Sequence, residues 1–248
     1  MNNSKYMNIR KYIKFRKFRN VNYSVSDTPL NEDVEKMRRE FPSTPAIKKE
    51  HLELMEKTHP QRREWIVSEK PSVLSVTQKY PRLFDTAEAL EDEFNRLHPK
   101  AKRLHEFWEV LPTKLLSIAR AEKNVEVLDY LLAQETSEES KSLNVLRALL
   151  ILLPNRKVAK LNQLVECFSH ETVEEAIESA SKQFTPQGGV IRVGTTYYVV
   201  LDKIGFRVPG GLLVDAIDFY VRALHVFNVE YGNLSASSLV FLQMLWHF

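Results

Sequence analysis

Apolar residues recur every three or four positions along most of residues 29–183, and this spacing limits the possible folds more than any other feature. It gives each helix one apolar face and predicts a largely helical core. The pattern begins after Thr28-Pro29, a helix-start signal, with Leu30, Val34 and Met37. With 7 Gly and 11 Pro among 248 residues, the chain has too few turn formers for a β-sandwich. We therefore expect a mainly α protein.

Several further helices are predicted before residue 134. One is expected around Leu52 and a separate one around Trp65. The run Asp85-Thr86-Ala87-Glu88 is typical of a capping box, in which the first carboxylate accepts a free backbone amide and Glu88 reaches back. Helical spacing then continues from Leu104 to Leu132, with a kink or break predicted at Pro112.

The second half of the chain predicts helices and a few short strands. Helices are expected over 143–153, 158–168, 172–181, 212–229 and 234–248, with Ser169 or Thr172 capping the third of these together with Glu175. Between them lie β-branched and aromatic runs separated by turn residues, at 190–193, 196–201 and 204–208. These runs predict a small antiparallel β-hairpin of two or three strands.

A change in composition suggests how the chain is divided. Residues 134–142 are polar and acidic, as in an exposed linker. We predict a helical lobe at 29–133 before this linker and a helical lobe with the short β-hairpin at 143–248 after it. Residues 1–28 have no sustained apolar period and are interpreted as a flexible basic arm.

The cysteine content and hydropathy bear on the compartment. Cys167 is the single cysteine, so it cannot close an intramolecular disulfide, which favours a reducing, intracellular location in the cytoplasm or nucleus. The most apolar window, 146–153, is far shorter than the roughly 20 residues that a transmembrane helix needs. No transmembrane segment is expected. A mitochondrial presequence at the basic start stays a minority alternative.

The basic arm is the strongest asymmetry in charge. Seven of the 35 Lys and Arg residues lie before Asp27, and none of the 32 Asp and Glu residues does. The rest of the chain therefore has more acidic than basic residues. Such a segment can bind phosphates by releasing counterions, and its aromatic residues can stack on bases. A solvated tail and a nuclear-import signal are the alternatives. The candidate nucleic-acid-binding residues are Arg10, Lys11, Lys14, Arg16, Lys17 and Arg19.

A nucleic-acid-binding protein would need this positive charge to continue onto its folded part. The places in the sequence where such a patch could form are Arg62, Arg63, Lys100, Lys102 and Arg103.

No catalytic or metal-binding motif is complete. Cys167 and His170 have the spacing of half a zinc site, but a structural site needs four ligands. Cys167 also falls on a predicted apolar helix face, which favours a buried, unreactive thiol over a nucleophile. The pair Gly188-Gly189 precedes strands rather than a helix and is better explained by turns than by a phosphate loop. We expect no catalytic residue, metal or cofactor.

One polar stripe interrupts the apolar helix predicted at 212–229. Asp215, Asp218, Arg222 and His225 follow each other at spacings of three and four, so they share one helix face. A binding or acid–base stripe is one interpretation. The favoured one is the single solvent-exposed face of a packed helix.

Two groups of residues carry a resemblance to a family. The first is Arg62-Arg63-Glu64 with Ile66, Pro71, the run 80–84 and Glu93-Phe94; the second is Tyr220, Ala223-Leu224, Asn228, Tyr231 and the run 241–243. In these the chain resembles vertebrate proteins labelled sterile alpha motif domain-containing protein 3-like, in the region outside the sterile alpha motif. The segment Leu201-Asp202-Lys203-Ile204-Gly205 departs from the acidic residue and Gly that the family usually shows after its last strand. The resemblance implies an interaction role without a mechanism.

Taken together, these features favour a non-enzymatic protein-interaction or regulatory module with an unidentified protein partner. The alternative is a nucleic-acid-binding protein that uses the basic N-terminal arm. An enzyme is the third and least favoured class.

Overall fold

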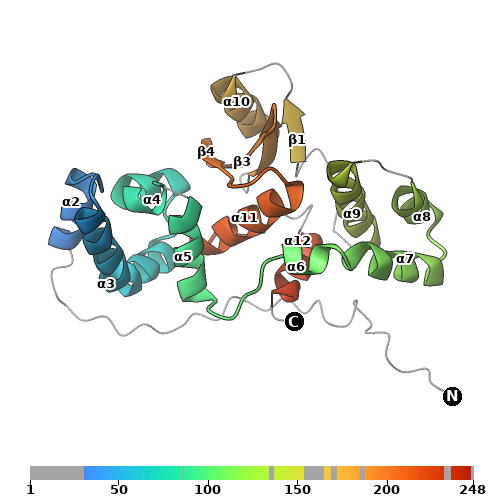
Figure 1. Ribbon diagram of the computed structural model, residues 1–248, viewed down its shortest axis with the longest axis horizontal. Coiled ribbons are helices and arrows are strands. Elements are labelled where there is room, and N and C mark those ends of the chain that lie inside the picture. The colour runs from blue at the N-terminus through green and yellow to red at the C-terminus, as the bar shows by residue number, and fades with distance from the viewer. Residues whose placement is uncertain are drawn as a thin grey trace.

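The computed structural model describes residues 31–85, 87–133, 137–153, 165–168, 172–184, 188–231 and 236–246 (Figure 1). The described residues are mainly helical, with a small sheet in the C-terminal half, as predicted. The helices that precede the sheet are α2 Asn31–Arg39, α3 Pro45–Glu69, α4 Val73–Lys79, the 3-10 helix η1 Pro81–Leu83, α5 Ala87–Leu97, α6 His105–Trp108, α7 Leu111–Ala121, α8 Val125–Leu132 and α9 Glu138–Leu152.

Helix α3 is continuous where two helices were predicted. It runs over Pro45–Glu69 with Pro60 inside it. Thr44 caps its start, because the Thr44 side chain accepts a hydrogen bond from the backbone N–H of Ile47. It ends at Lys70, which has a left-handed φ of 46°. The predicted break is wrong because buried residues on both sides of the proline pack into the protein, and tertiary packing outweighs the lost helical hydrogen bond.

The sheet has four strands in the order β1-β2-β3-β4. Three antiparallel strands confirm the predicted hairpin region: β2 Gly189–Val193, β3 Thr196–Leu201 and β4 Ile204–Arg207. Asp202 and Lys203 join β3 to β4. Their φ angles of 49° and 66° are those of a two-residue turn whose twist matches the flanking strands.

The first strand, β1 Val165–Phe168, was not predicted. The helix expected at 158–168 is wrong at this end, and residues 158–164 lie outside the described part. β1 pairs in parallel with β2, and α10 Val173–Gln183 provides the crossover that a parallel pair needs. A short apolar run fits a strand and a buried helix equally well, so spacing alone could not separate them. The capping box of α10, formed by Thr172 and Glu175, is confirmed.

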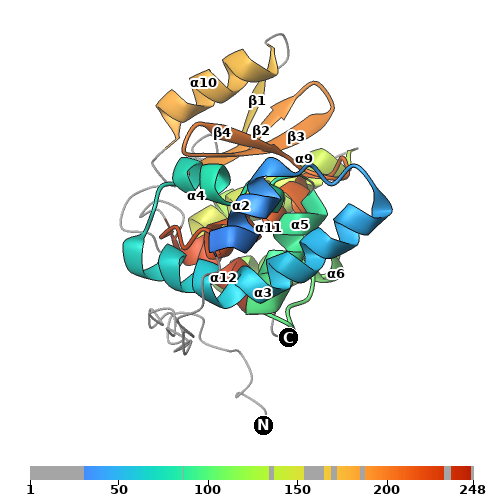
Figure 2. The same ribbon diagram turned by 90° about the vertical axis from the view of Figure 1, so that its left-hand side faces the viewer.

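Helix α11 Leu213–Val226 lies at the centre of the molecule. It packs under one face of the sheet while α10 covers the other face, and α2–α4 and α7–α9 lie at opposite ends (Figures 1 and 2). All residues of α11 except Asp215 are buried. The α10 face has its own small apolar cluster, whereas the α11 face belongs to the main core.

The main core is shared by segments before and after the predicted linker. Phe94 and Trp108 from the first part pack in the same core as Leu149 and Trp246 from the second. Residues 138–142 of the predicted linker form the start of α9, which Ser137 caps. Residues 134–136 lie outside the described part. The division into lobes at 29–133 and 143–248 stays a prediction.

The last described helix, α12 Ala236–Leu245, closes this core. Leu239, Leu242 and Trp246 are fully buried, as expected for residues that fill it. The backbone N–H of Lys102 donates to the carbonyl oxygen of Trp246 at 3.1 Å. The end of the described chain is therefore fixed to the segment between α5 and α6.

Candidate functional site

The predicted nucleic-acid-binding residues lie outside the described part of the chain, because residues 1–30 are not described. They are Arg10, Lys11, Lys14, Arg16, Lys17 and Arg19. The structure therefore places none of them. Cys167 lies on strand β1 rather than on the predicted helix.

The positions proposed for a basic patch do not all lie on the surface. Arg62 is 0% exposed, so it cannot contribute to a surface. Arg63 is half-buried and donates to the carbonyl oxygens of His225 and Val226, both at 3.0 Å. Arg103 is paired with Glu91 at 2.6 Å. Arg62 and Arg63 are thus engaged within the fold, while Lys100, Lys102 and Arg103 are exposed.

Arg62 instead forms a buried ion pair between α3 and α5. Its Nε and Nη2 atoms donate to the two carboxylate oxygens of Glu93 at 2.8 and 2.6 Å. Nη1 donates to the hydroxyl of Thr58 at 2.8 Å and Nη2 to the carbonyl of Met55 at 3.1 Å. Burial on its own would raise the pKa of Glu93, but the charge and hydrogen bonds of Arg62, helped by Arg96, hold that pKa below its ordinary value.

The polar stripe of α11 is also buried, which corrects the expectation that it faces solvent. The carboxylate of Asp218 accepts hydrogen bonds from Nε of Arg222 at 3.0 Å and from the indole of Trp246 at 3.1 Å. His225 lies 3.0 Å from His98 and 2.8 Å from the hydroxyl of Tyr231, nitrogen to nitrogen and nitrogen to oxygen. Burial raises the pKa of Asp218, although Arg222 and Trp246 oppose this shift.

We call Arg62, Glu93, Asp218, Arg222 and His225 the polar core. Each of these side chains is buried and has hydrogen-bond partners on another helix or segment. Arg222, for example, reaches the carbonyl of Lys102 at 3.0 Å. The arrangement joins α3, α5 and α11 to neighbouring segments, and none of its five residues lines the pocket described next.

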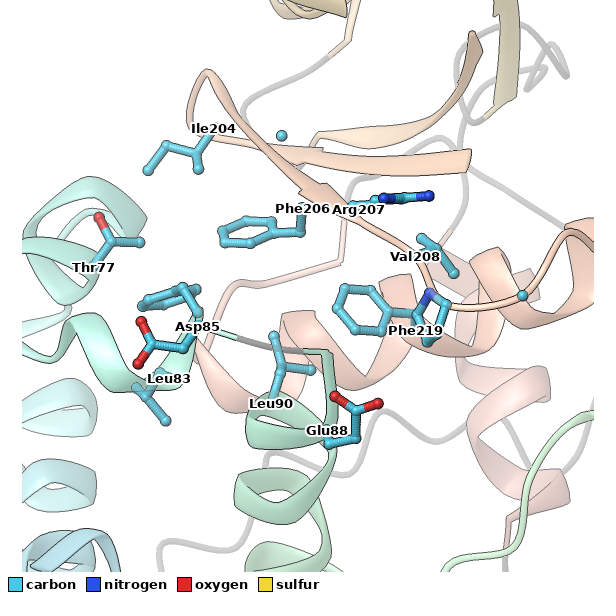
Figure 3. Close-up of a pocket in the computed structure, with 14 residues that line it drawn as sticks. Thr77, Leu83, Asp85, Glu88, Leu90, Ile204, Phe206, Arg207, Val208 and Phe219 are labelled. Carbon is cyan, nitrogen blue, oxygen red and sulfur yellow. The ribbon is translucent and has the colours of Figure 1, made fainter. Parts of the chain in front are cut away.

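A pocket of about 700 Å³ lies between α5 and the edge of the sheet (Figure 3). This volume is in the range of pockets that hold ligands. Its walls come from α4, η1, the start of α5, β4 and α11. The lining residues are Thr77, Leu83, Phe84, Asp85, Glu88, Leu90, Ile204, Gly205, Phe206, Arg207, Val208, Pro209, Gly210 and Phe219.

Aromatic rings form the apolar wall of the pocket. The rings of Phe84 and Phe206 have their centroids 5.2 Å apart, and behind them Phe227 lies 5.5 Å from Phe84 and 5.8 Å from Phe206. We call these three residues the phenylalanine cluster. Phe84 comes from the helical N-terminal segment and Phe206 from β4, so the cluster joins the two parts of the fold.

Charged groups lie at the rim of the pocket. Asp85 accepts a hydrogen bond from Nη1 of Arg82 at 2.5 Å, which balances its charge. Glu88 and Arg207 are exposed and lie across the pocket from each other (Figure 3). Arg207 forms no ion pair with another described residue. A ligand in this pocket would therefore meet an apolar wall with charges at its edge.

The turn between β3 and β4 lies next to the pocket and is bonded to α4. A carboxylate oxygen of Asp202 accepts a hydrogen bond from the backbone N–H of Leu74, at the start of α4, at 3.2 Å. Because Ile204 lines the pocket directly after this turn, the contact sets the distance between β4 and α4.

The pocket offers few kinds of polar group. Its lining has carboxylates, a guanidinium and the Thr77 hydroxyl, which donates to the carbonyl of Leu74 at 2.7 Å. No Cys, His or Lys lines it. Within the described ranges, no three His, Cys, Asp or Glu side chains are grouped to hold a metal ion.

Sequence reasoning did not find this pocket. Its walls come from segments more than 100 residues apart, and neither the run 77–90 nor the run 204–210 looks like a site alone. The one signal in the sequence was Phe206, an aromatic residue on a predicted strand. Its neighbours Gly205 and Arg207 do not predict that the other face of this strand is buried.

Comparison with known proteins gives one match. Residues 31–85 match the family model of sterile alpha motif domain-containing protein 3, helical domain. This match confirms the predicted resemblance and covers α2, α3, α4 and η1, ending at Asp85 on the rim of the pocket. No curated protein and no solved structure matches the chain. Among the helices that the structure describes, none combines the length and apolar character needed to cross a bilayer.

Proposed function

We propose that this chain, similar over residues 31–85 to the helical domain of sterile alpha motif domain-containing protein 3, is a non-enzymatic protein-interaction or regulatory module. The pocket beside β4 is its binding site for a segment of a partner protein. The observation that carries the proposal is the apolar wall around Phe84 and Phe206 in an open cavity of about 700 Å³. The absence of Cys, His and Lys from its lining supports binding rather than catalysis.

The pocket lies where two parts of the fold meet, which is a common place for a binding site. Its α4 and η1 side belongs to the segment that matches the family, and its β4 side does not. The single cysteine supports an intracellular location, in the cytoplasm or nucleus.

Nucleic-acid binding stays an alternative predicted from the sequence alone. It depends on arm residues such as Arg10 and Lys14 that lie outside the described part. On the described body, Arg62 and Arg63 are engaged with Glu93 and with backbone carbonyls, so they do not extend a basic surface.

A blocking substitution tests the proposal. Thr77 lines the pocket from α4, so Thr77→Trp places an indole in the space that a ligand needs. The matched control is Ser117→Trp, because Ser117 is an exposed helical residue on α7 whose hydroxyl likewise donates to the carbonyl three residues earlier.

The probe is a displayed library of random peptides selected on the full chain. We expect enrichment of peptides with large apolar residues, a loss of their affinity of about tenfold or more in Thr77→Trp, and unchanged binding to Ser117→Trp. Thermal melting of both variants checks that they fold. Equal binding to all three proteins would refute the pocket as the site, and no enrichment would refute a peptide-binding role.

A further inference from the structure

β4 is an edge strand with a free side. The sheet order places β3 on one side of it and no described strand on the other. The backbone N–H of Val208 donates to the carbonyl oxygen of Tyr197 on β3 at 2.9 Å. One step along the same ladder, Phe206 lies opposite Val199. Backbone groups alternate in direction along an antiparallel strand. Gly205 and Arg207 therefore direct their N–H and C=O groups away from β3.

These outward groups have no backbone partner among the described residues. The pocket runs along this strand, since Ile204, Gly205, Phe206 and Arg207 all line it. A row of unpaired N–H and C=O groups is a template for another extended chain. The pocket beside the strand provides the room that such a chain needs.

The two faces of β4 differ in chemistry. Ile204 and Phe206 share one face, and Phe206 joins the phenylalanine cluster. Gly205 belongs to the opposite face, since a Cβ on it would lie 2.3 Å from Ile177 of α10. Arg207 alternates with Phe206 and so belongs to that second face. Its exposed guanidinium forms no ion pair with another described residue.

We propose that the pocket binds an extended segment of a partner protein as a fifth strand on the free edge of β4. In this segment, apolar side chains enter the pocket beside Ile204 and Phe206. Acidic side chains alternate with them and pair with Arg207 across the strands. The partner is recognised by this apolar–acidic alternation. The inference rests on the proposed binding function and specifies how the pocket is used.

Two variants of one residue separate backbone pairing from side-chain pairing. Arg207→Ala removes the guanidinium and keeps the N–H. Arg207→Pro removes the outward N–H as well, while the bonds of Phe206 and Val208 to β3 remain, and proline is tolerated on the free side of an edge strand. The probes are two libraries of extended peptides that share apolar residues at alternate positions and carry either Glu or Lys at the positions between.

We expect the Glu library to bind the native chain about tenfold more tightly than the Lys library. Arg207→Ala removes most of this preference and retains binding. Arg207→Pro loses a further threefold to tenfold, on the order of one hydrogen bond. Circular dichroism and thermal melting establish that both variants fold.

A second measurement leaves the protein unchanged. The best Glu peptide is synthesised with N-methyl groups on one or the other alternate set of its amides. Strand addition requires that one set abolishes binding and the other does not. Strand addition is overturned if the two sets of N-methyl groups weaken binding equally, or if Arg207→Ala and Arg207→Pro bind the peptide equally well. In either case, binding that Thr77→Trp blocks still supports the pocket as the site. If the native chain forms a dimer and Arg207→Pro abolishes it, the occupant of the edge is a second copy of this chain and the proposed partner segment is overturned.

Discussion

The polar core and the phenylalanine cluster hold the fold together by different means. In the polar core, hydrogen bonds of 2.6 and 3.1 Å join Arg62 on α3 to Glu93 on α5 and the Trp246 indole to Asp218 on α11. In the cluster, Phe84, Phe206 and Phe227 pack ring against ring without a polar group. The first region is held by directional bonds and the second by ring packing.

The difference shows what each region contributes. Aromatic packing adds favourable free energy and tolerates small shifts, which suits a wall beside an open pocket. A buried ion pair adds little net stability because its desolvation offsets its attraction, but it penalises any arrangement in which a charge loses its partner. We interpret the polar core as the element that sets the orientation of α3, α5 and α11.

The largest expected effect is that of Glu93→Gln. This change leaves the fully buried charge of Arg62 without a counterion, so the free energy of unfolding should fall by about 3–5 kcal/mol. Urea unfolding followed by circular dichroism measures it. A loss below about 1 kcal/mol would show that water reaches this pair.

The matched control replaces both partners. Arg62→Met combined with Glu93→Leu removes both charges, and Thr58 keeps its own hydrogen bond to the carbonyl of Leu54 at 2.7 Å. The double variant should recover most of the stability lost by Glu93→Gln. If it is the less stable of the two, packing rather than an unpaired charge governs this region.

A smaller effect is expected in the phenylalanine cluster. Phe206→Leu keeps an apolar side chain but removes the ring contacts to Phe84 and Phe227. The free energy of unfolding should fall by about 1 kcal/mol. Denaturant unfolding compares this variant with Glu93→Gln directly. A loss as large as that of Glu93→Gln would remove the contrast between the two regions.

The smallest effect concerns pH. Burial lowers the pKa of His59 below its ordinary value of 6.5, with Arg62 and Arg96 acting in the same direction against Glu93. Between the lowered pKa and 6.5 the unfolded chain binds a proton that the folded chain does not, so stability falls as the pH drops below 6.5. The lowered pKa of Glu93 places its own loss of stability at more acidic pH.

Urea unfolding at about pH 7.5 and about pH 5.5 tests this, and His59→Gln should flatten the difference between the two. Wild type and variant with the same pH dependence would show that His59 does not contribute. The phenylalanine cluster has no titratable group, so Phe206→Leu should keep the slope of the native chain.

Local sequence signals predicted most helices and the three antiparallel strands, because their periodicity is set within a few residues. They failed where the outcome depends on distant partners. Asp218 and Arg222 resemble an exposed stripe until Trp246 and the carbonyl of Lys102 are placed beside them. Arg62 and Glu93 are 31 residues apart, and nothing local predicts their pairing.

The pocket was missed for the same reason. Periodicity predicted β4 and the helix that begins at Ala87, but not that they face each other. Their separation depends partly on the bond from Leu74 to Asp202, between residues 128 positions apart. A strand's free edge is visible only once its neighbours in the sheet are known.

The position of Trp246 has a consequence for the order of events during translation. Its indole lies 4.7 Å from the ring of Phe94, centroid to centroid, and bonds to Asp218. A ribosome releases Phe94 long before Trp246, so the nascent chain carries an incomplete core until this tryptophan has left the exit tunnel. The core around Phe94 on α5 is thus completed only when Trp246, which follows the last described helix, has emerged.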